Sequence, residues 1–169
     1  MATTSDLLLD SLGRVRETAH QVLDDIPEEL LATPPAPGTN TVAWLLWHLT
    51  RGLDEQVAHA FGRDALWEAG GWRERLALPL PGDAHGYGMT FEEVLLVRAS
   101  AADLRGYLDA AFDAAESSLR TVTDADLDRV VDEQWDPPVT LAVRLVSVVD
   151  DCTQHVGQAS YAAGILDRR

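Results

Sequence analysis

The spacing of apolar residues is the feature that most constrains the fold, because four long segments follow the helical period and none alternates as a strand. The first segment begins at a predicted cap, Ser5, and ends before Pro27, with apolar side chains three and four positions apart. The other three are predicted over 41–62, 90–119 and 140–164, each beginning at a capping residue or just after prolines. The sequence therefore predicts an all-α protein.

The connection between the second and third segments, residues 63–89, contains too many Gly and Pro residues for a continuous helix. Connections this long in compact domains are usually functional or serve as crossovers. A long crossover allows the two helices that it joins to run parallel, whereas short links would give an up-down-up-down bundle. We therefore expect a four-helix bundle with one long crossover, folded as a single domain over residues 1–169.

Charge and cysteine content restrict the partners and the cellular compartment that we expect. The chain has 28 acidic and 13 basic side chains, all of the latter Arg, and a net charge of −15. Such a surface repels phosphate groups, so we expect neither a nucleic acid nor an anionic membrane as partner. Cys152 is the only cysteine, which excludes an internal disulfide and favours a reducing compartment. Without a signal-like start or a membrane-length apolar run, we expect a cytoplasmic protein.

A polar cluster interrupts the last predicted helix, in the stretch "VVDDCTQHVGQASY". Asp151 and His155 are four positions apart, so their side chains lie on the same helical face and suit a shared metal ion. Asp150 points elsewhere and is interpreted as solvated or capping. Two ligands do not make a stable site, so a third is expected from a facing helix. The alternative is a hydrogen-bonded pair without a metal.

His48 is the predicted third ligand, because it is an imidazole in the apolar stretch "VAWLLWHLT". His59 lies nearly on the same face but about 16 Å further along the helix, so these two histidines cannot share one ion. Gly52, one turn after His48, would leave room beside the imidazole.

Other polar and aromatic residues have weaker interpretations. His85 and Tyr87 are candidates for a lid above the metal, and four tryptophans are candidates for a pocket wall: Trp44, Trp47, Trp67 and Trp72. Cys152 is interpreted as a core residue, because no neighbouring cation would lower its pKa. Asp54 and Glu55 are interpreted as a solvated face. Arg51 and Arg144 are interpreted as solvated ion pairs, with binding of an anionic substrate or cofactor as the alternative.

The segments "NTVAWLLWHL" and "DDCTQHVGQASYAAGIL", with the long crossover between them, resemble the DinB-like superfamily of bacterial four-helix bundles, also called YfiT-like. The resemblance covers nearly the whole chain and implies one divalent metal, with His48, Asp151 and His155 at the ligand positions. Many relatives have histidine where this chain has Asp151. An acidic residue there resembles the branch of the mycothiol-dependent maleylpyruvate isomerase N-terminal domain, and implies an altered metal preference.

The resemblance implies thiol chemistry on small molecules. A metal ion, most simply Zn²⁺, with Ni²⁺, Mn²⁺ or Fe²⁺ as alternatives, would activate a thiol such as mycothiol, or a water, for transfer or isomerisation of an electrophile. A homodimer is common in the resembled family. Two alternatives stay open: an Fe(II) oxygenase, and a non-catalytic metal-binding or stress-associated protein.

Overall fold

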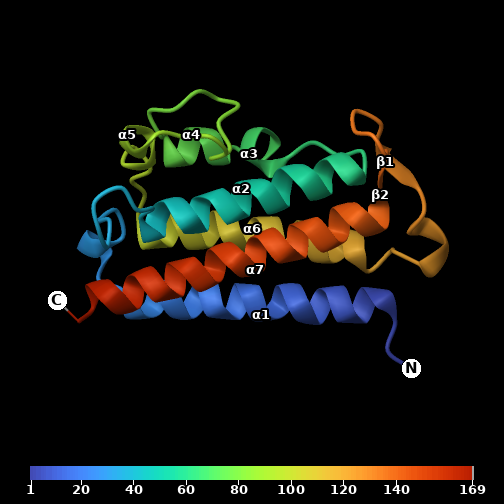
Figure 1. Cartoon of the computed structure of the whole chain (residues 1–169), viewed down its shortest axis with the longest axis horizontal. Helices are drawn as coiled ribbons and strands as arrows, with labels where there is room; N and C mark the ends of the chain where they lie inside the picture. Colours follow the sequence, from blue (N-terminus) through green and yellow to red (C-terminus); the bar gives the residue numbers. More distant parts are fainter. Residues whose placement is uncertain (169) are drawn as a thin grey trace.

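Four long helices form the body of the computed structural model, which describes residues 1–168 (Figure 1). They are α1 (Thr4–Asp25), α2 (Val42–Ala60), α6 (Ala101–Leu119) and α7 (Leu141–Leu166). Helices α2 and α6 run in one direction, and α1 and α7 run in the other (Figure 1). Both α1 and α2 pack against α6 and α7. The predicted all-α bundle with a long crossover is confirmed.

The core lies between these helices, on the faces that the apolar spacing predicts. In α7 the buried positions follow one another at steps of three and four, and they are Leu141, Leu145, Val148, Cys152, Val156, Ala159, Ala162 and Leu166. Helix α2 is buried around most of its circumference, because the crossover covers its outer side (Figure 1). None of the helices described in residues 1–168 is long and apolar enough to cross a membrane.

The crossover contains three short helices, α3 (Leu66–Ala69), α4 (Trp72–Leu76) and α5 (Phe91–Val94). Helix α4 follows Gly71 and α5 follows the capping Thr90, whereas α3 follows Ala65 and ends at Gly70, and none of the three extends much beyond one turn. The intervening segment 77–90 has no helix or strand. It lies next to the candidate site described below.

The prediction of one continuous helix over 90–119 is wrong. Thr90 begins a capping box with Glu93, but the helix that it caps, α5, ends at Val94. A second cap follows at Ser100, whose side chain accepts a hydrogen bond from the backbone N–H of Asp103 at 3.0 Å and starts α6. Each cap satisfies backbone donors at a helix start, so two caps in succession mark two helices.

The structure also contains one short hairpin that the all-α prediction did not include. After the short helix η2 (Asp124–Asp126), strands β1 (Val130–Asp132) and β2 (Val139–Thr140) form an antiparallel hairpin with an irregular register. Strands of two and three residues are too short to show alternation in the sequence.

Two predicted caps are displaced by one or two positions. Helix α1 is capped by Thr3 rather than Ser5, and α2 by Thr41 rather than Asn40. A further short helix, η1 (Glu28–Leu30), precedes the proline-rich connection to α2. These shifts lie within the usual uncertainty of helix ends.

Candidate metal centre

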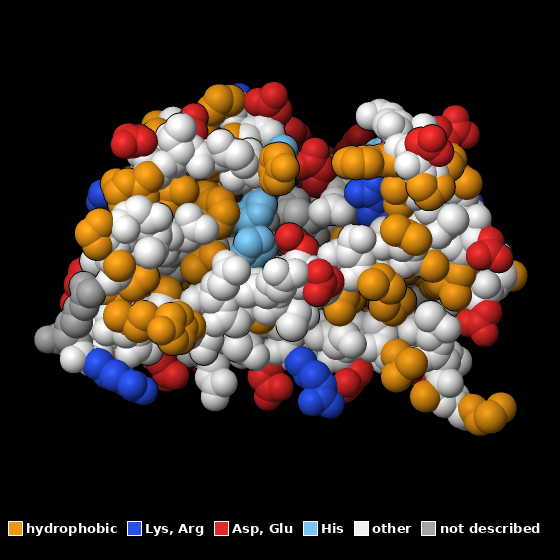
Figure 2. Space-filling view, viewed as in Figure 1, with side chains coloured by type: hydrophobic (Ala, Val, Ile, Leu, Met, Phe, Trp, Pro, Cys, Tyr) orange, Lys and Arg blue, Asp and Glu red, His pale blue; other side chains and the backbone are white. Residues whose placement is uncertain are grey.

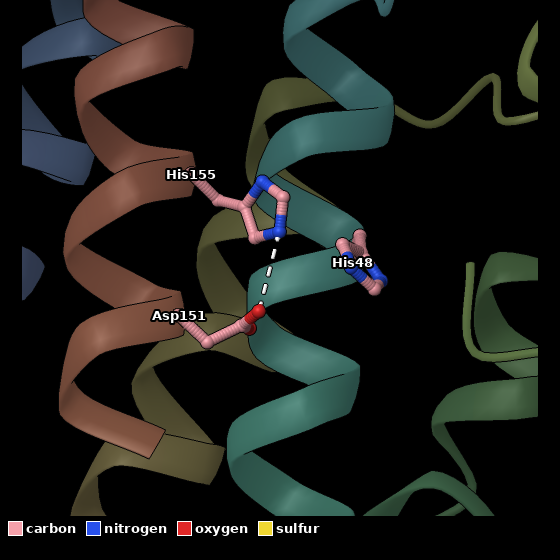
Figure 3. A group of neighbouring side chains, drawn as sticks. All are labelled: His48, Asp151 and His155. Atoms are coloured by element: carbon pink, nitrogen blue, oxygen red, sulfur yellow. Dashed lines mark ion pairs between the residues drawn. The ribbon is translucent and has the colours of Figure 1, made fainter. Parts of the chain in front are cut away.

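The structure brings together the three predicted ligands, His48 from α2 and Asp151 and His155 from α7 (Figure 3). Each of them offers a ligand atom, and these three atoms lie within 4.8 Å of one another. The imidazole of His155 lies one turn above Asp151, with 3.4 Å between Nε2 and Oδ1. The rings of His48 and His155 meet edge to face, with centroids 4.6 Å apart.

The Nδ1 atom of each imidazole lies within hydrogen-bond distance of an oxygen atom. Nδ1 of His48 lies 2.5 Å from the carbonyl oxygen of His85, and Nδ1 of His155 lies 3.1 Å from Oε1 of Gln158. The backbone carbonyl of His85 can only accept, so it assigns the proton of neutral His48 to Nδ1, whereas the amide of Gln158 can present either its oxygen or its NH2 group to His155. Nε2 of His48 is then the nitrogen that offers a lone pair to the site.

The centre therefore combines a carboxylate, the Nε2 lone pair of His48 and the Nε2 atom of His155, which lies 3.4 Å from the carboxylate. Its electrostatics reflect this arrangement. The hydrogen bond with Asp151 raises the pKa of His155, and the same contact lowers the pKa of Asp151. Burial lowers the pKa of His48, and this effect outweighs the opposing effect of its hydrogen bond to His85. A cation stabilises such a cluster, either a proton on His155 or a metal ion that all three share.

Trp44 is the one predicted pocket tryptophan that contacts the centre. Its indole stacks on the His48 ring with centroids 4.7 Å apart, and meets the His155 ring edge to face at 6.1 Å. Trp47 and Trp67 are buried, and Trp67 and Trp72 pack against Tyr107. These three tryptophans belong to the core and to the crossover instead.

A groove of about 420 Å³ opens beside the centre, and Figure 2 shows this face hollowed, with histidine side chains in the hollow. It is lined by His48, Gly52, Glu55, Gln56, His59, His85, Tyr87, Asp132, Arg144 and Asp151. The structure places the predicted lid residues His85 and Tyr87 on its wall. A Cβ added at Gly52 would lie 3.4 Å from Oδ2 of Asp151, so this glycine leaves room beside the carboxylate.

The remaining polar candidates lie outside the triad. His59 lines the groove but contributes no atom to the cluster, as its distance along α2 predicts. Asp150 is exposed and accepts a hydrogen bond from Nε2 of Gln154 at 2.8 Å. Arg144 donates to Gln56 at 3.0 Å and to Asp132 of β1 at 2.7 Å. The last contact fastens the hairpin to the side of the groove.

The interpretation of Asp54 as part of a solvated face is wrong. Its side chain is 5% exposed, and Oδ1 accepts a hydrogen bond from the N–H of Leu66 at 2.9 Å. Oδ2 accepts from the N–H of Trp67 and from the hydroxyl of Tyr107, both at 2.8 Å. All three donors lie far from Asp54 in the sequence, so periodicity gave no sign of them.

Arg51 is buried rather than a solvated ion pair. It is 3% exposed, with its guanidinium carbon 4.9 Å from the centre of the Trp67 ring. Its Nε donates to the carbonyl of Ala84 at 3.2 Å, and it also pairs with Glu55 at 3.3 Å. Cys152 is fully buried, and burial raises its pKa, which confirms its interpretation as a core residue.

Comparisons with known proteins agree with this fold. The family model of the DinB superfamily matches residues 11–159. The crystal structure of a conserved protein from Enterococcus faecalis is similar over 100% of both chains, with 34% sequence identity and a TM-score of 0.93. The search of curated proteins gives no match. With most of its length matched by the family model, the chain belongs to the DinB superfamily.

Proposed function

We propose that this protein binds one divalent metal ion through His48, Asp151 and His155 and uses it in thiol-dependent transfer to, or isomerisation of, a small electrophile. The observation that supports the metal is the convergence of two imidazole nitrogens and a carboxylate oxygen within 4.8 Å. These atoms are common ligands of divalent transition metals.

The number of ligands supports a catalytic rather than a structural ion. Structural zinc sites are closed by four protein ligands, whereas catalytic sites have three and leave a position for water or substrate. When bound there, Zn²⁺ would lower the pKa of a coordinated thiol or water. Nickel, manganese and iron suit the same residues.

The groove supports the binding of a small molecule. Its volume of about 420 Å³ lies in the range of small-ligand sites, and His48 and Asp151 both line it. The protein itself would hold the two imidazoles at their Nδ1 atoms and bind the small molecule in the groove beside α2. Mycothiol is proposed as the thiol only because the acidic ligand at position 151 resembles that branch of the superfamily.

A non-catalytic metal-binding role is the second candidate. In that case the ion would join α2 to α7 and stabilise the bundle. The groove beside the ligands favours the enzyme, because an ion that only supports the bundle needs no access for a substrate.

The first test is metal content, measured by plasma mass spectrometry on untagged protein. We expect about one ion per chain in the wild type, and loss of the ion in His48→Ala and Asp151→Ala. The matched control is His59→Ala, which changes a histidine of the same groove outside the triad and should retain the ion. Less than about a tenth of an ion per wild-type chain, even after reconstitution with Zn²⁺, Ni²⁺, Mn²⁺ and Fe²⁺, would exclude the metal mechanism.

The second test separates the two candidates. Metal-loaded protein is incubated with a low-molecular-weight thiol and a fluorogenic electrophile, and conjugation is followed against time. Acceleration that disappears in Asp151→Ala supports the transferase. Metal binding without any acceleration, over a panel of thiols and electrophiles, favours the non-catalytic role.

A further inference from the structure

The crossover segment 82–89 is held against α2 and α3 by hydrogen bonds from buried and partly buried side chains. Three of its backbone carbonyls each accept a hydrogen bond from a different side chain: Gly82 from Trp67 at 2.9 Å, Ala84 from Arg51 at 3.2 Å, and His85 from His48 at 2.5 Å. The sulfur of Met89 accepts from the indole N–H of Trp44 at 3.3 Å. The last two of these donors, Trp44 and His48, stack on one another.

Gly86 makes the contact with His48 sterically feasible. It is buried, and its φ of +108° lies in a region that residues with a side chain rarely adopt. A Cβ at this position would overlap the His48 ring, with Nδ1 as the nearest atom. The backbone of the segment therefore lies against the imidazole and leaves no room for a side chain at position 86.

We propose that Gly86 is a positioning residue of the candidate metal centre, because its conformation and its lack of a side chain let the His85 carbonyl bond Nδ1 of His48. That bond selects the tautomer in which Nε2 carries a lone pair that faces Asp151 and His155. The metal part of this inference rests on the proposed function, whereas the choice of tautomer does not.

The contact would prepare His48 as a ligand before the ion binds. A neutral imidazole can hold its proton on either nitrogen, and only the Nδ1–H form leaves Nε2 able to bind a metal. Stacking on Trp44 fixes the plane of the ring, and the carbonyl fixes its rotation and its proton. Loss of such a partner typically weakens metal binding by about 10- to 100-fold.

The test compares Gly86→Ala with Gly88→Ala. Gly88 also has a positive φ, +74°, but a Cβ there has no neighbour within 4 Å, so this control tests an alanine at a positive φ in the same segment without the overlap. We expect Gly86→Ala to bind Zn²⁺ or Co²⁺ about 10- to 100-fold more weakly than wild type. Gly88→Ala should stay within about threefold of wild type, and circular dichroism should show both variants helical. Equal affinities for wild type and Gly86→Ala would overturn the inference.

A second measurement uses metal-free wild-type protein, so it depends neither on metal binding nor on whether a variant folds. In metal-free wild type at about pH 8, where a neutral imidazole is expected, ¹⁵N-detected correlation spectra identify which nitrogen of His48 carries the proton. A proton on Nδ1 supports the inference, and one on Nε2 overturns it. If the wild type binds no metal, the proposed function fails, and the His48 tautomer still decides this inference.

Discussion

Two aspartates in the apolar part of the bundle, Asp54 on α2 and Asp151 on α7, have opposite surroundings. Three hydrogen-bond donors surround the Asp54 carboxylate, two backbone N–H groups and the Tyr107 hydroxyl, all at 2.8 to 2.9 Å. Asp151 instead faces ring nitrogens of two histidines, with its nearest contact at 3.4 Å. The protein supplies three donors to the first carboxylate, whereas the second faces ring nitrogens and is 37% exposed.

This difference separates a structural carboxylate from a candidate ligand. A buried carboxylate is stable when the fold supplies N–H and O–H groups to it. One that meets other acceptors gains nothing until a proton or a metal ion joins them. The two residues are identical, but Asp54 is 5% exposed and surrounded by donors, whereas the Asp151 side chain is 37% exposed and lines the groove.

Removing each carboxylate should give the largest contrast in stability. Asp54→Ala leaves a hydroxyl and two N–H groups buried without partners, and should lower the free energy of unfolding by about 3 kcal/mol. Asp151→Ala, measured with a chelator present, should change it by less than about 1 kcal/mol, because that side chain is 37% exposed and loses one long contact. Urea unfolding measures both values. Equal losses would mean that Asp151 is structural as well.

Adding metal should narrow the difference in stability between the two variants. Zn²⁺ at about 100 times its Kd should stabilise the wild type by about 2.7 kcal/mol, because the ion binds the folded chain. Asp151→Ala should show no such stabilisation. Thermal unfolding with and without a chelator gives the comparison, and an equal rise of Tm in both proteins would place the ion elsewhere.

Acid should weaken the candidate metal centre. The hydrogen bond with Asp151 raises the pKa of His155 above its ordinary 6.5, so protons compete with the metal for Nε2 as the pH falls through that pKa. Affinity should then fall by about tenfold per pH unit for each proton displaced. Competition titrations between about pH 5 and pH 8 test this slope. An affinity independent of pH over that range would argue against imidazole ligands.

The smallest expected effect is that of Tyr107→Phe. Asp54 keeps its two backbone donors, and the ring keeps its packing against Trp67 and Trp72. The loss of one hydroxyl should lower the free energy of unfolding by about 1 kcal/mol and leave metal affinity unchanged. Urea unfolding and a metal titration of the same sample measure the two quantities. A weaker metal affinity would show that the two regions are coupled.

Much of the bundle could be predicted because helices depend on nearby residues. The last helix was predicted over 140–164 and runs from Leu141 to Leu166, since its apolar spacing and the cap at Thr140 are local signals. The split between α5 and α6 was missed although its second cap, Ser100, is equally local. The cap at Thr90 predicts where a helix begins but not where it ends, so it fits a long helix as well as the short α5.

The candidate centre was predictable in part for the same reason. The four-residue spacing of Asp151 and His155 places both on one face of α7 in any helix. The choice of His48 depended on an imidazole in an apolar stretch and on the family resemblance. Whether these three residues bind a metal stays a prediction.

The sequence by itself determined the helices, the long crossover and the faces on which the candidate ligands lie, because these follow from the helical period and from local caps. Tertiary structure alone decided which donors and acceptors surround each polar side chain. The contact between His48 and His85 spans 37 positions, and the one between Tyr107 and Asp54 spans 53. Such contacts depend on how α2, α7 and the crossover pack together, and no local pattern specifies that packing.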